Sequence, residues 1–171
     1  MTKTLGLLVN IVVKIMDLEI QQCTMDDLKQ IKAEIFDFWG TDRTLYVHQR
    51  LLIKKHGESA YVIKEGEKVM AYLIGFVDHE RDIGWVHLIG VRESHKKKGI
   101  GRYLYNHFIE YAKQNGCKKI KALTIPENKE SIAFHKKIGM KFLGVPNEEG
   151  LPVIKNHHDS GQDRVEMEMD I

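Results

Sequence analysis

The sequence is poor in cysteine and has little net charge. Only Cys23 and Cys117 are cysteines among 171 residues, and 26 Lys and Arg residues nearly balance 24 Asp and Glu residues. Two distant cysteines make neither a disulfide framework nor a metal site with the usual ligand spacing, and they suit the reducing cytoplasm. The near balance of charge argues against a general nucleic-acid or membrane surface, so we expect neither as a partner.

Apolar runs long enough to cross a membrane are also missing. Residues 5–15 are apolar, but Asn10 and Lys14 interrupt this short segment, so it cannot span a bilayer. No small-residue cleavage site follows it, which argues against a signal peptide. We expect residues 1–15 to be an N-terminal extension or an extra strand, and residues 16–171 to form a single domain. A chain of this length buries about two-thirds of its unfolded surface, enough for a core without metals or disulfides.

The spacing of apolar residues predicts alternating strands and helices. Leu18 and Ile20 alternate with polar residues, which predicts a strand, and Thr24 with Asp27 forms a capping box at the start of a helix. Three β-branched and aromatic runs follow, separated by turn residues, and predict an antiparallel meander. The expected strands are 17–23, 59–64, 69–77, 83–91, 119–125, 140–144 and 165–171, and the expected helices are 24–38, 45–55, 99–114 and 128–138.

One stretch, IGVRESHKKKGIGR at residues 89–102, predicts a strand, a turn and a helix. Gly99 and Gly101 have no Cβ, so the backbone can approach an anion closely while the unpaired amides of the first helical turn point at it. The stretch therefore predicts a phosphate-binding turn, with a merely tight connection as the alternative. Four basic side chains add positive charge at the same place: Lys96, Lys97, Lys98 and Arg102.

Two common nucleotide motifs do not fit this turn. The phosphate loop needs four residues between its glycines, followed by Lys and then Ser or Thr, whereas a single residue separates Gly99 from Gly101. The dinucleotide fingerprint needs a third glycine where this chain has Leu104. The local concentration of basic residues suits a different polyanionic small ligand.

Val91 followed by Lys96-Lys97-Lys98-Gly99-Ile100-Gly101 resembles the acetyl-CoA signature of the GNAT acetyltransferases, although Lys96 stands where the family has Arg or Gln. The resemblance implies an α/β (α+β) chain with the GNAT acyl-CoA N-acyltransferase fold, whose mixed, mostly antiparallel central sheet is flanked by about four helices. It also implies acetyl-CoA as the cofactor and an N-acetyltransferase activity. The acceptor would be a primary amine of a small molecule or a peptide.

The same resemblance implies how acetyl-CoA is held. The pyrophosphate would lie on the amides of residues 97–102, while the backbone of residues 89–91 would pair with pantetheine, and the amide of Val91 or a neighbour could polarise the carbonyl. Gly90, inside the strand, predicts a bulge or a close approach to the backbone. The expected cofactor-binding residues are Ile89, Gly90, Val91, Lys96, Lys97, Lys98, Gly99, Ile100, Gly101, Arg102 and Asn128.

Two histidines are the candidates for proton transfer. The strand glutamate of many family members is replaced by Trp85, but His87 matches a histidine of the arylalkylamine N-acetyltransferases and could act as the base, or be only a packing residue. A second match to the family runs from Asn128 to His135, which replaces the usual tyrosine. His135 could protonate the thiolate or only orient the cofactor, and Asn128 could touch the cofactor arm or cap a helix.

In the GNAT fold the segment 37–43 borders the acceptor pocket, so Trp39 and Arg43 are candidates for substrate contact, with a packed helix junction as the alternative. No metal site is expected, because the adjacent His157 and His158 diverge and no spaced partner completes a ligand set. Two other functions stay open, a module that binds CoA without turnover and nucleic-acid binding through the lysine run. A homodimer is a further expectation.

Overall fold

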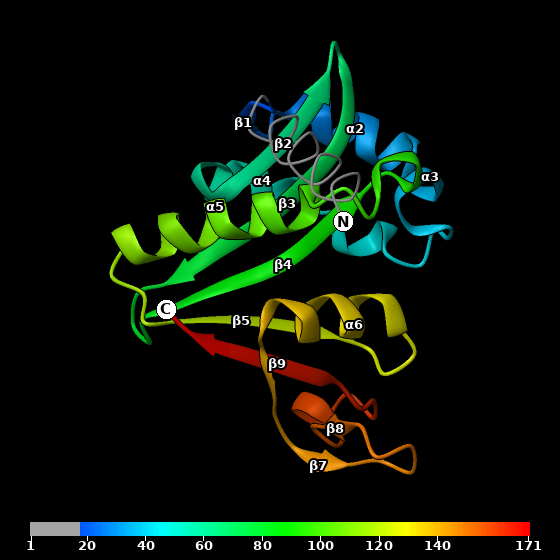
Figure 1. Ribbon diagram of the computed structural model, residues 1–171, viewed down its shortest axis with the longest axis vertical. Helices are drawn as coiled ribbons and strands as arrows, with labels where there is room; N and C mark the ends of the chain where they lie inside the picture. Colours follow the sequence, from blue (N-terminus) through cyan, green and yellow to red (C-terminus); the bar gives the residue numbers. More distant parts are fainter. Residues whose placement is uncertain (1–17) are drawn as a thin grey trace, which may run out of the picture. The chain divides into compact units, whose positions relative to one another are not determined.

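The computed structural model describes residues 18–171 (Figure 1). The expectation for residues 1–15 lies outside this range. The described chain forms two compact units, the first comprising residues 18–75 and 88–108 and the second comprising residues 76–87 and 109–171. Hydrogen bonds connect seven strands in the order β1-β2-β3-β4-β5-β9-β6, while β7 and β8 form a separate pair. No helix of the described chain is long and apolar enough to cross a membrane.

Most elements lie where the sequence predicts them. The strands are β1 (Ile20–Gln22), β2 (Ala60–Glu65), β3 (Lys68–Asp78), β4 (Ile83–Val91), β5 (Lys119–Thr124), β6 (Lys141–Phe142), β7 (Val145–Pro146), β8 (Pro152–Val153) and β9 (Val165–Asp170). The helices are α2 (Met25–Ala33), α3 (Ile35–Trp39), α4 (Arg50–His56), α5 (Ile100–Gln114) and α6 (Lys129–Ile138), and the short 3₁₀ turns include η1 (Leu45–Val47) and η3 (Glu93–His95).

Two of the expected helices are broken. The helix expected at 24–38 divides into α2 and α3, because Glu34 leaves helical geometry at φ −109° and ψ 28°. The helix expected at 45–55 divides into η1 and α4, because His48 and Gln49 have non-helical ψ angles of 65° and 135°. The ring of His48 is fully buried and bonded to other segments. Here a tertiary contact overrides the local helical pattern.

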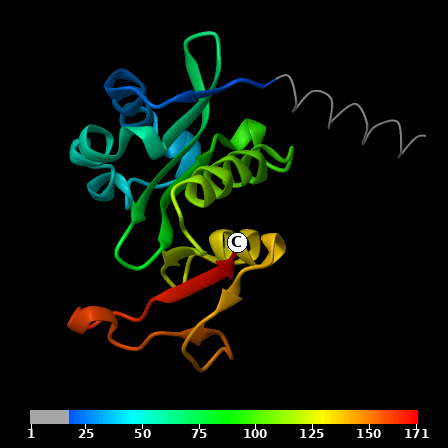
Figure 2. The ribbon, with the colours of Figure 1, turned by 90° about the vertical axis from the view of Figure 1, so that its left-hand side faces the viewer.

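The core of the first unit lies on one face of the β2–β3 hairpin. Leu28, Ile31 and Phe38 of α2 and α3 pack there with Val62 and Tyr72 of the two strands. Since side chains alternate along a strand, neighbouring residues point to the opposite face, where Tyr61 meets the ring of His107 of α5 edge-on at 4.5 Å between centroids. Figure 2 shows α2 to α4 on one side of the hairpin and α5 on the other.

The predicted capping box at the start of α2 is confirmed. The Asp27 amide donates to Thr24 Oγ1 at 3.1 Å, and the Thr24 amide donates to Asp27 Oδ2 at 2.9 Å. Lys64 of β2 donates to the other carboxylate oxygen at 3.1 Å. Burial opposes ionisation of Asp27, but the hydrogen bonds from Thr24 and Lys64 outweigh it and hold the pKa of this carboxyl below its usual value.

The second unit joins parallel and antiparallel strands. The first half of β4 pairs in parallel with β5, from Ile83↔Lys119 to Val86↔Ala122, and β9 pairs antiparallel with β5. Helix α6 lies beside the β5–β9 pair in both views (Figures 1 and 2). Ion pairs cross from β5 to β9, with Lys119 Nζ 2.8 Å from Glu168 and Lys121 Nζ 2.7 Å from Glu166. The predicted mixed, mostly antiparallel sheet is thus confirmed.

Candidate functional site

The segment 96–102, called the glycine turn below, connects η3 to α5 in the first unit. Lys97 and Gly99 both have left-handed backbone, with φ of 61° and 85°, and bend the chain just before the helix. The first helical hydrogen bond runs from the Tyr103 amide to the Gly99 carbonyl at 3.0 Å. By helix geometry the amides of Ile100 and Gly101 have no acceptor within α5, so they can bind an anion.

Two basic side chains of the glycine turn contact η3. Lys96 forms an ion pair with Glu93 at 2.8 Å, and Lys98 Nζ donates to the Ser94 carbonyl at 2.9 Å, so both brace the turn against η3. The residues Lys97, Lys98 and Arg102 are exposed. Main-chain donors, nearby cations and a residue without a side chain at the bend together fit a diphosphate. The seven expected cofactor residues of this segment therefore lie together.

Gly90 of β4 makes the expected close approach. A Cβ at this position would lie 2.5 Å from Cε1 and 2.9 Å from the hydroxyl oxygen of Tyr72, closer than packed atoms allow. The ring of Tyr72 on β3 therefore occupies the space that a side chain at residue 90 would need. Ile89 and Val91 are half-buried on either side of Gly90.

Trp39 is half-buried at the end of α3, and its indole Nε1 donates to the Tyr72 hydroxyl at 2.7 Å. The same hydroxyl lies 2.6 Å from Nε2 of His48, whose Nδ1 lies 2.7 Å from the Thr44 carbonyl oxygen. We call Trp39, Thr44, His48 and Tyr72 the Tyr72 cluster. The second candidate for acceptor contact, Arg43, is exposed, and its amide donates to Thr41 Oγ1 at 3.2 Å.

Arg92, directly after β4, is a residue that sequence reasoning missed. It is only 4% exposed. Its guanidinium forms ion pairs with Glu34 and Asp37, donates to the Val69 carbonyl at 2.9 and 3.1 Å, and lies 4.6 Å from the ring centroid of Phe38. Arg92 thus joins the segment before the glycine turn to α3. The available signal was the pair of carboxylates, Glu34 between α2 and α3 and Asp37 within α3, but their partner is 55 or more residues away in sequence.

In the second unit, His87 lies on β4 and is exposed. Residues 83, 85, 87, 89 and 91 of this strand are all less buried than residues 84, 86, 88 and 90. Trp85, on the same face as His87, stacks on Phe76 at 6.4 Å between centroids, and Lys121 lies 5.8 Å from its ring centroid. The side chain of His87 therefore belongs to the more accessible face of β4.

His135 and Asn128 belong to α6. His135 is only 3% exposed, and its Nδ1 lies 2.8 Å from the Ser131 carbonyl oxygen, so Nδ1 carries a proton. Burial lowers the pKa of His135, with the hydrogen bond to Ser131 acting in the opposite direction. Asn128 caps α6 by accepting from the Ser131 amide at 3.3 Å, and its amide donates to Thr124 Oγ1 at 3.1 Å. The cap, which was the alternative role for Asn128, is thus present, and its contact with the cofactor stays a prediction.

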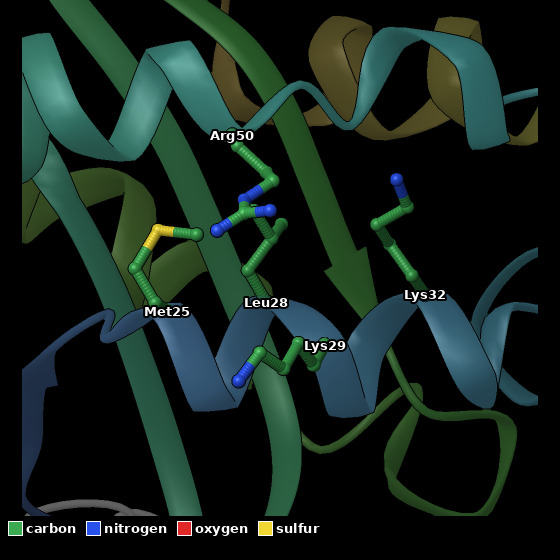
Figure 3. Close-up of a pocket in the computed structure, with 5 residues that line it drawn as sticks. All are labelled: Met25, Leu28, Lys29, Lys32 and Arg50. Atoms are coloured by element: carbon green, nitrogen blue, oxygen red, sulfur yellow. The ribbon is translucent and has the colours of Figure 1, made fainter.

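A shallow hollow of about 210 Å³ lies between α2 and α4, and Figure 3 shows Arg50 reaching from α4 toward α2. The hollow is lined by Met25, Leu28, Lys29, Lys32 and Arg50. None of these was a predicted site residue.

His157 and His158 form part of a 3₁₀ turn. Within residues 18–171 no group of His, Cys, Asp and Glu could hold a metal ion.

Known proteins share both the sequence pattern and the fold. A family model described as the acetyltransferase (GNAT) family matches residues 25–140. An uncharacterized N-acetyltransferase of Methanocaldococcus jannaschii is 26% identical over 136 residues, which cover 71% of this chain. The chain spans about 60% of the length of that relative.

Two solved structures have the same fold. A GNAT-family protein of Desulfovibrio desulfuricans superposes with a TM-score of 0.72 at 15% identity, over 90% of this chain and 98% of that chain. A Bacillus subtilis acetyltransferase in complex with CoA superposes with a TM-score of 0.61 at 18% identity, over 91% of this chain and 99% of that chain. The predicted GNAT fold is thus confirmed, and the chain belongs to the acetyltransferase (GNAT) family.

Proposed function

We propose that this protein transfers an acetyl group from acetyl-CoA to a primary amine of a small molecule or peptide. The observation that carries the proposal is the glycine turn, which opens the 15-residue helix α5 inside the segment matched by the family model. Acetyl-CoA is the acetyl donor of this family, and a structural neighbour was solved with CoA. When bound, it supplies an activated acetyl thioester.

The first task of the chain is to hold this donor. The amides of residues 97–102 and the charges of Lys97 and Arg102 would bind the pyrophosphate, because main-chain donors at a helix N-terminus stabilise negative charge. The backbone of Ile89 and Val91 would orient the pantetheine arm. The Val91 amide would polarise the thioester carbonyl by donating a hydrogen bond to its oxygen.

The second task is to move protons. The amine nitrogen forms a bond to the carbonyl carbon, the carbon–sulfur bond breaks, the amine loses a proton, and the sulfur gains one. We propose His87 as the group that accepts the amine proton, directly or through water, and its exposure on the accessible face of β4 supports this role.

His135 is the candidate to protonate the sulfur, but its surroundings favour the alternative. A buried imidazole with a lowered pKa whose Nδ1 proton is committed to a carbonyl holds few protons to give at neutral pH. We therefore propose that His135 orients the cofactor, and that Asn128 contributes mainly as the α6 cap. Trp39 and Arg43 would contact the acceptor.

Calorimetry with acetyl-CoA and CoA, followed by a free-thiol assay over a panel of amines, tests the proposal. The panel should include aliphatic diamines, arylalkylamines and peptides with free N-termini. We expect micromolar binding of acetyl-CoA and amine-dependent thiol release. Binding without release for any amine would favour a CoA-binding module, and no heat of binding would overturn the proposal.

The role of His87 has its own test. In a His87→Ala variant we expect kcat to fall about 100-fold at neutral pH, the usual range for loss of a general base. The fall should be smaller at high pH, where more of the amine is already neutral. A variant with normal turnover across the whole pH range would remove His87 from the mechanism while leaving the proposed reaction intact.

A further inference from the structure

We propose that Tyr72 is a positioning residue that holds the acceptor-contacting segment in place beside the strand that binds the thioester. The inference rests on the proposed function and assigns a role to the Tyr72 cluster. Tyr72 touches two regions of the first unit at once. Its hydroxyl bonds the indole of Trp39 from α3, and its ring contacts the Gly90 backbone of β4.

The hydrogen bonds of the cluster run in one direction. A carbonyl oxygen only accepts, so Nδ1 of His48 donates to Thr44, and Nε2 of the neutral ring is left as an acceptor. The Tyr72 hydroxyl donates to this nitrogen and accepts from the Trp39 indole. The hydroxyl does both and a phenyl ring can do neither, so phenylalanine at position 72 would remove one hydrogen bond from each of two polar groups.

The two groups would respond differently to that loss. His48 is completely buried and cannot turn to water. Trp39 is half-buried, so its indole can rotate outward and hydrate its N–H. This rotation would move the aromatic ring that we assign to acceptor contact. The hydroxyl of Tyr72 therefore fixes the Trp39 ring without touching the substrate itself.

The arrangement also limits how Trp39 can recognise an acceptor. Because its indole N–H is already bonded to Tyr72, the ring can offer only its apolar edge and its π face. A π face attracts cations and apolar groups. We therefore expect acceptors with an aromatic or cationic group near the reacting amine to depend most strongly on Tyr72.

A Tyr72→Phe variant tests the inference, with Tyr61→Phe as the matched control. Tyr61 is also a buried tyrosine of the first unit, and its hydroxyl donates to the Glu58 carbonyl at 2.9 Å. We expect Tyr72→Phe to raise the KM for the acceptor about tenfold and to leave the Kd for acetyl-CoA within twofold. Tyr61→Phe should leave both constants unchanged.

Nuclear magnetic resonance gives a readout that needs no activity. The chain has two tryptophans, so ¹⁵N spectra should contain two indole signals, and a Trp85→Phe variant assigns the one from Trp39. We expect Tyr72→Phe to shift this signal and speed its exchange with solvent, whereas Tyr61→Phe should do neither. An unshifted signal would overturn the inference.

The outcomes separate this inference from the proposed function. If the wild-type protein releases no thiol with any amine, the proposed function fails and the inference fails with it. If the wild-type protein is active and Tyr72→Phe has an unchanged acceptor KM, the inference alone fails. If Tyr72→Phe does not fold, His48→Leu replaces it, because it removes the buried acceptor of the Tyr72 hydroxyl. His48→Gln, which keeps an acceptor, should restore the acceptor KM.

Discussion

The glycine turn and the Tyr72 cluster belong to the same compact unit but are built in opposite ways. The turn consists of seven consecutive residues, and most of the groups that we propose to bind acetyl-CoA there are main-chain amides. The cluster brings together side chains from α3, the η1 region and β3, and it is closed by the backbone of Gly90. A site made of consecutive backbone groups is visible in a sequence, whereas one made of distant side chains is not.

The largest expected effect comes from Arg92, which connects the segment just before the glycine turn to α3. Arg92→Ala removes a buried guanidinium and leaves Glu34 and Asp37 without their cation, so we expect the free energy of unfolding to fall by about 3 kcal/mol. Urea denaturation measures this change in the free energy of unfolding. Arg81→Ala is the control, because Arg81 forms an exposed pair with Asp78 and its loss should leave stability unchanged. Equal effects of the two variants would mean that Arg92 contributes no more than a surface charge.

The second prediction concerns packing in the cluster. Gly90→Ala would place a methyl group 2.5 Å from Tyr72 Cε1, so we expect a loss of about 2 kcal/mol in unfolding free energy. The loss should shrink in a Tyr72→Leu background, since the clashing ring is then gone. Gly57→Ala meets no atom within 4 Å and has right-handed helical backbone, with φ −60° and ψ −30°, so it should not destabilise. A Gly90→Ala protein as stable as Gly57→Ala would contradict the packing described for Tyr72.

The third prediction concerns the turn. Gly99→Ala forces a side chain onto left-handed backbone beside the amides that we propose to bind the pyrophosphate, so we expect acetyl-CoA affinity to fall at least tenfold and stability to fall by about 1 kcal/mol. Gly116→Ala has nearly the same φ, 81°, in the turn after α5. It should lose similar stability and keep its affinity, as calorimetry and thermal melting can show. Equal affinity losses would remove the glycine turn from the binding site.

The smallest effect tests a local motif outside both regions. Asp27→Asn should cost about 1 kcal/mol of stability at neutral pH, because the carboxylate of the capping box is lost. Since the folded pKa of Asp27 lies below its usual value, its contribution is complete above the unfolded pKa and disappears as the pH falls through the folded one. Denaturation curves of the two proteins should therefore converge in acid. A difference that persists at low pH would point to packing rather than charge.

Much of the fold follows from local signals. The capping box at Thr24, the turn at Gly66 and the alternation from Ile83 to Val91 each depend on neighbouring residues, and each is confirmed. The helix breaks at Glu34 and His48 are not local. They coincide with contacts to Arg92 and Tyr72, residues that lie far away in sequence.

The candidate site also has features that local sequence predicts and features that depend on distant residues. The sequence predicts the glycine turn and a close approach to the backbone at Gly90. It does not predict that the ring of Tyr72 is the group that lies there. Tyr72 lies in an apolar run, and only the need of a buried hydroxyl for partners hints at a special role. Trp39 was predicted to contact substrate by its place in the family fold, while its bond to Tyr72 depends on the packing of β3 against α3.

The two tryptophans also have a practical value, because Trp39 belongs to one compact unit and Trp85 to the other. Each is thus a built-in fluorescent probe of its own half of the protein. A variant that keeps only Trp39 would report the melting curve of the first unit, and a variant that keeps only Trp85 would report that of the second. Coincident midpoints would mean that the halves unfold as one cooperative body, and distinct midpoints would reveal a partly unfolded intermediate.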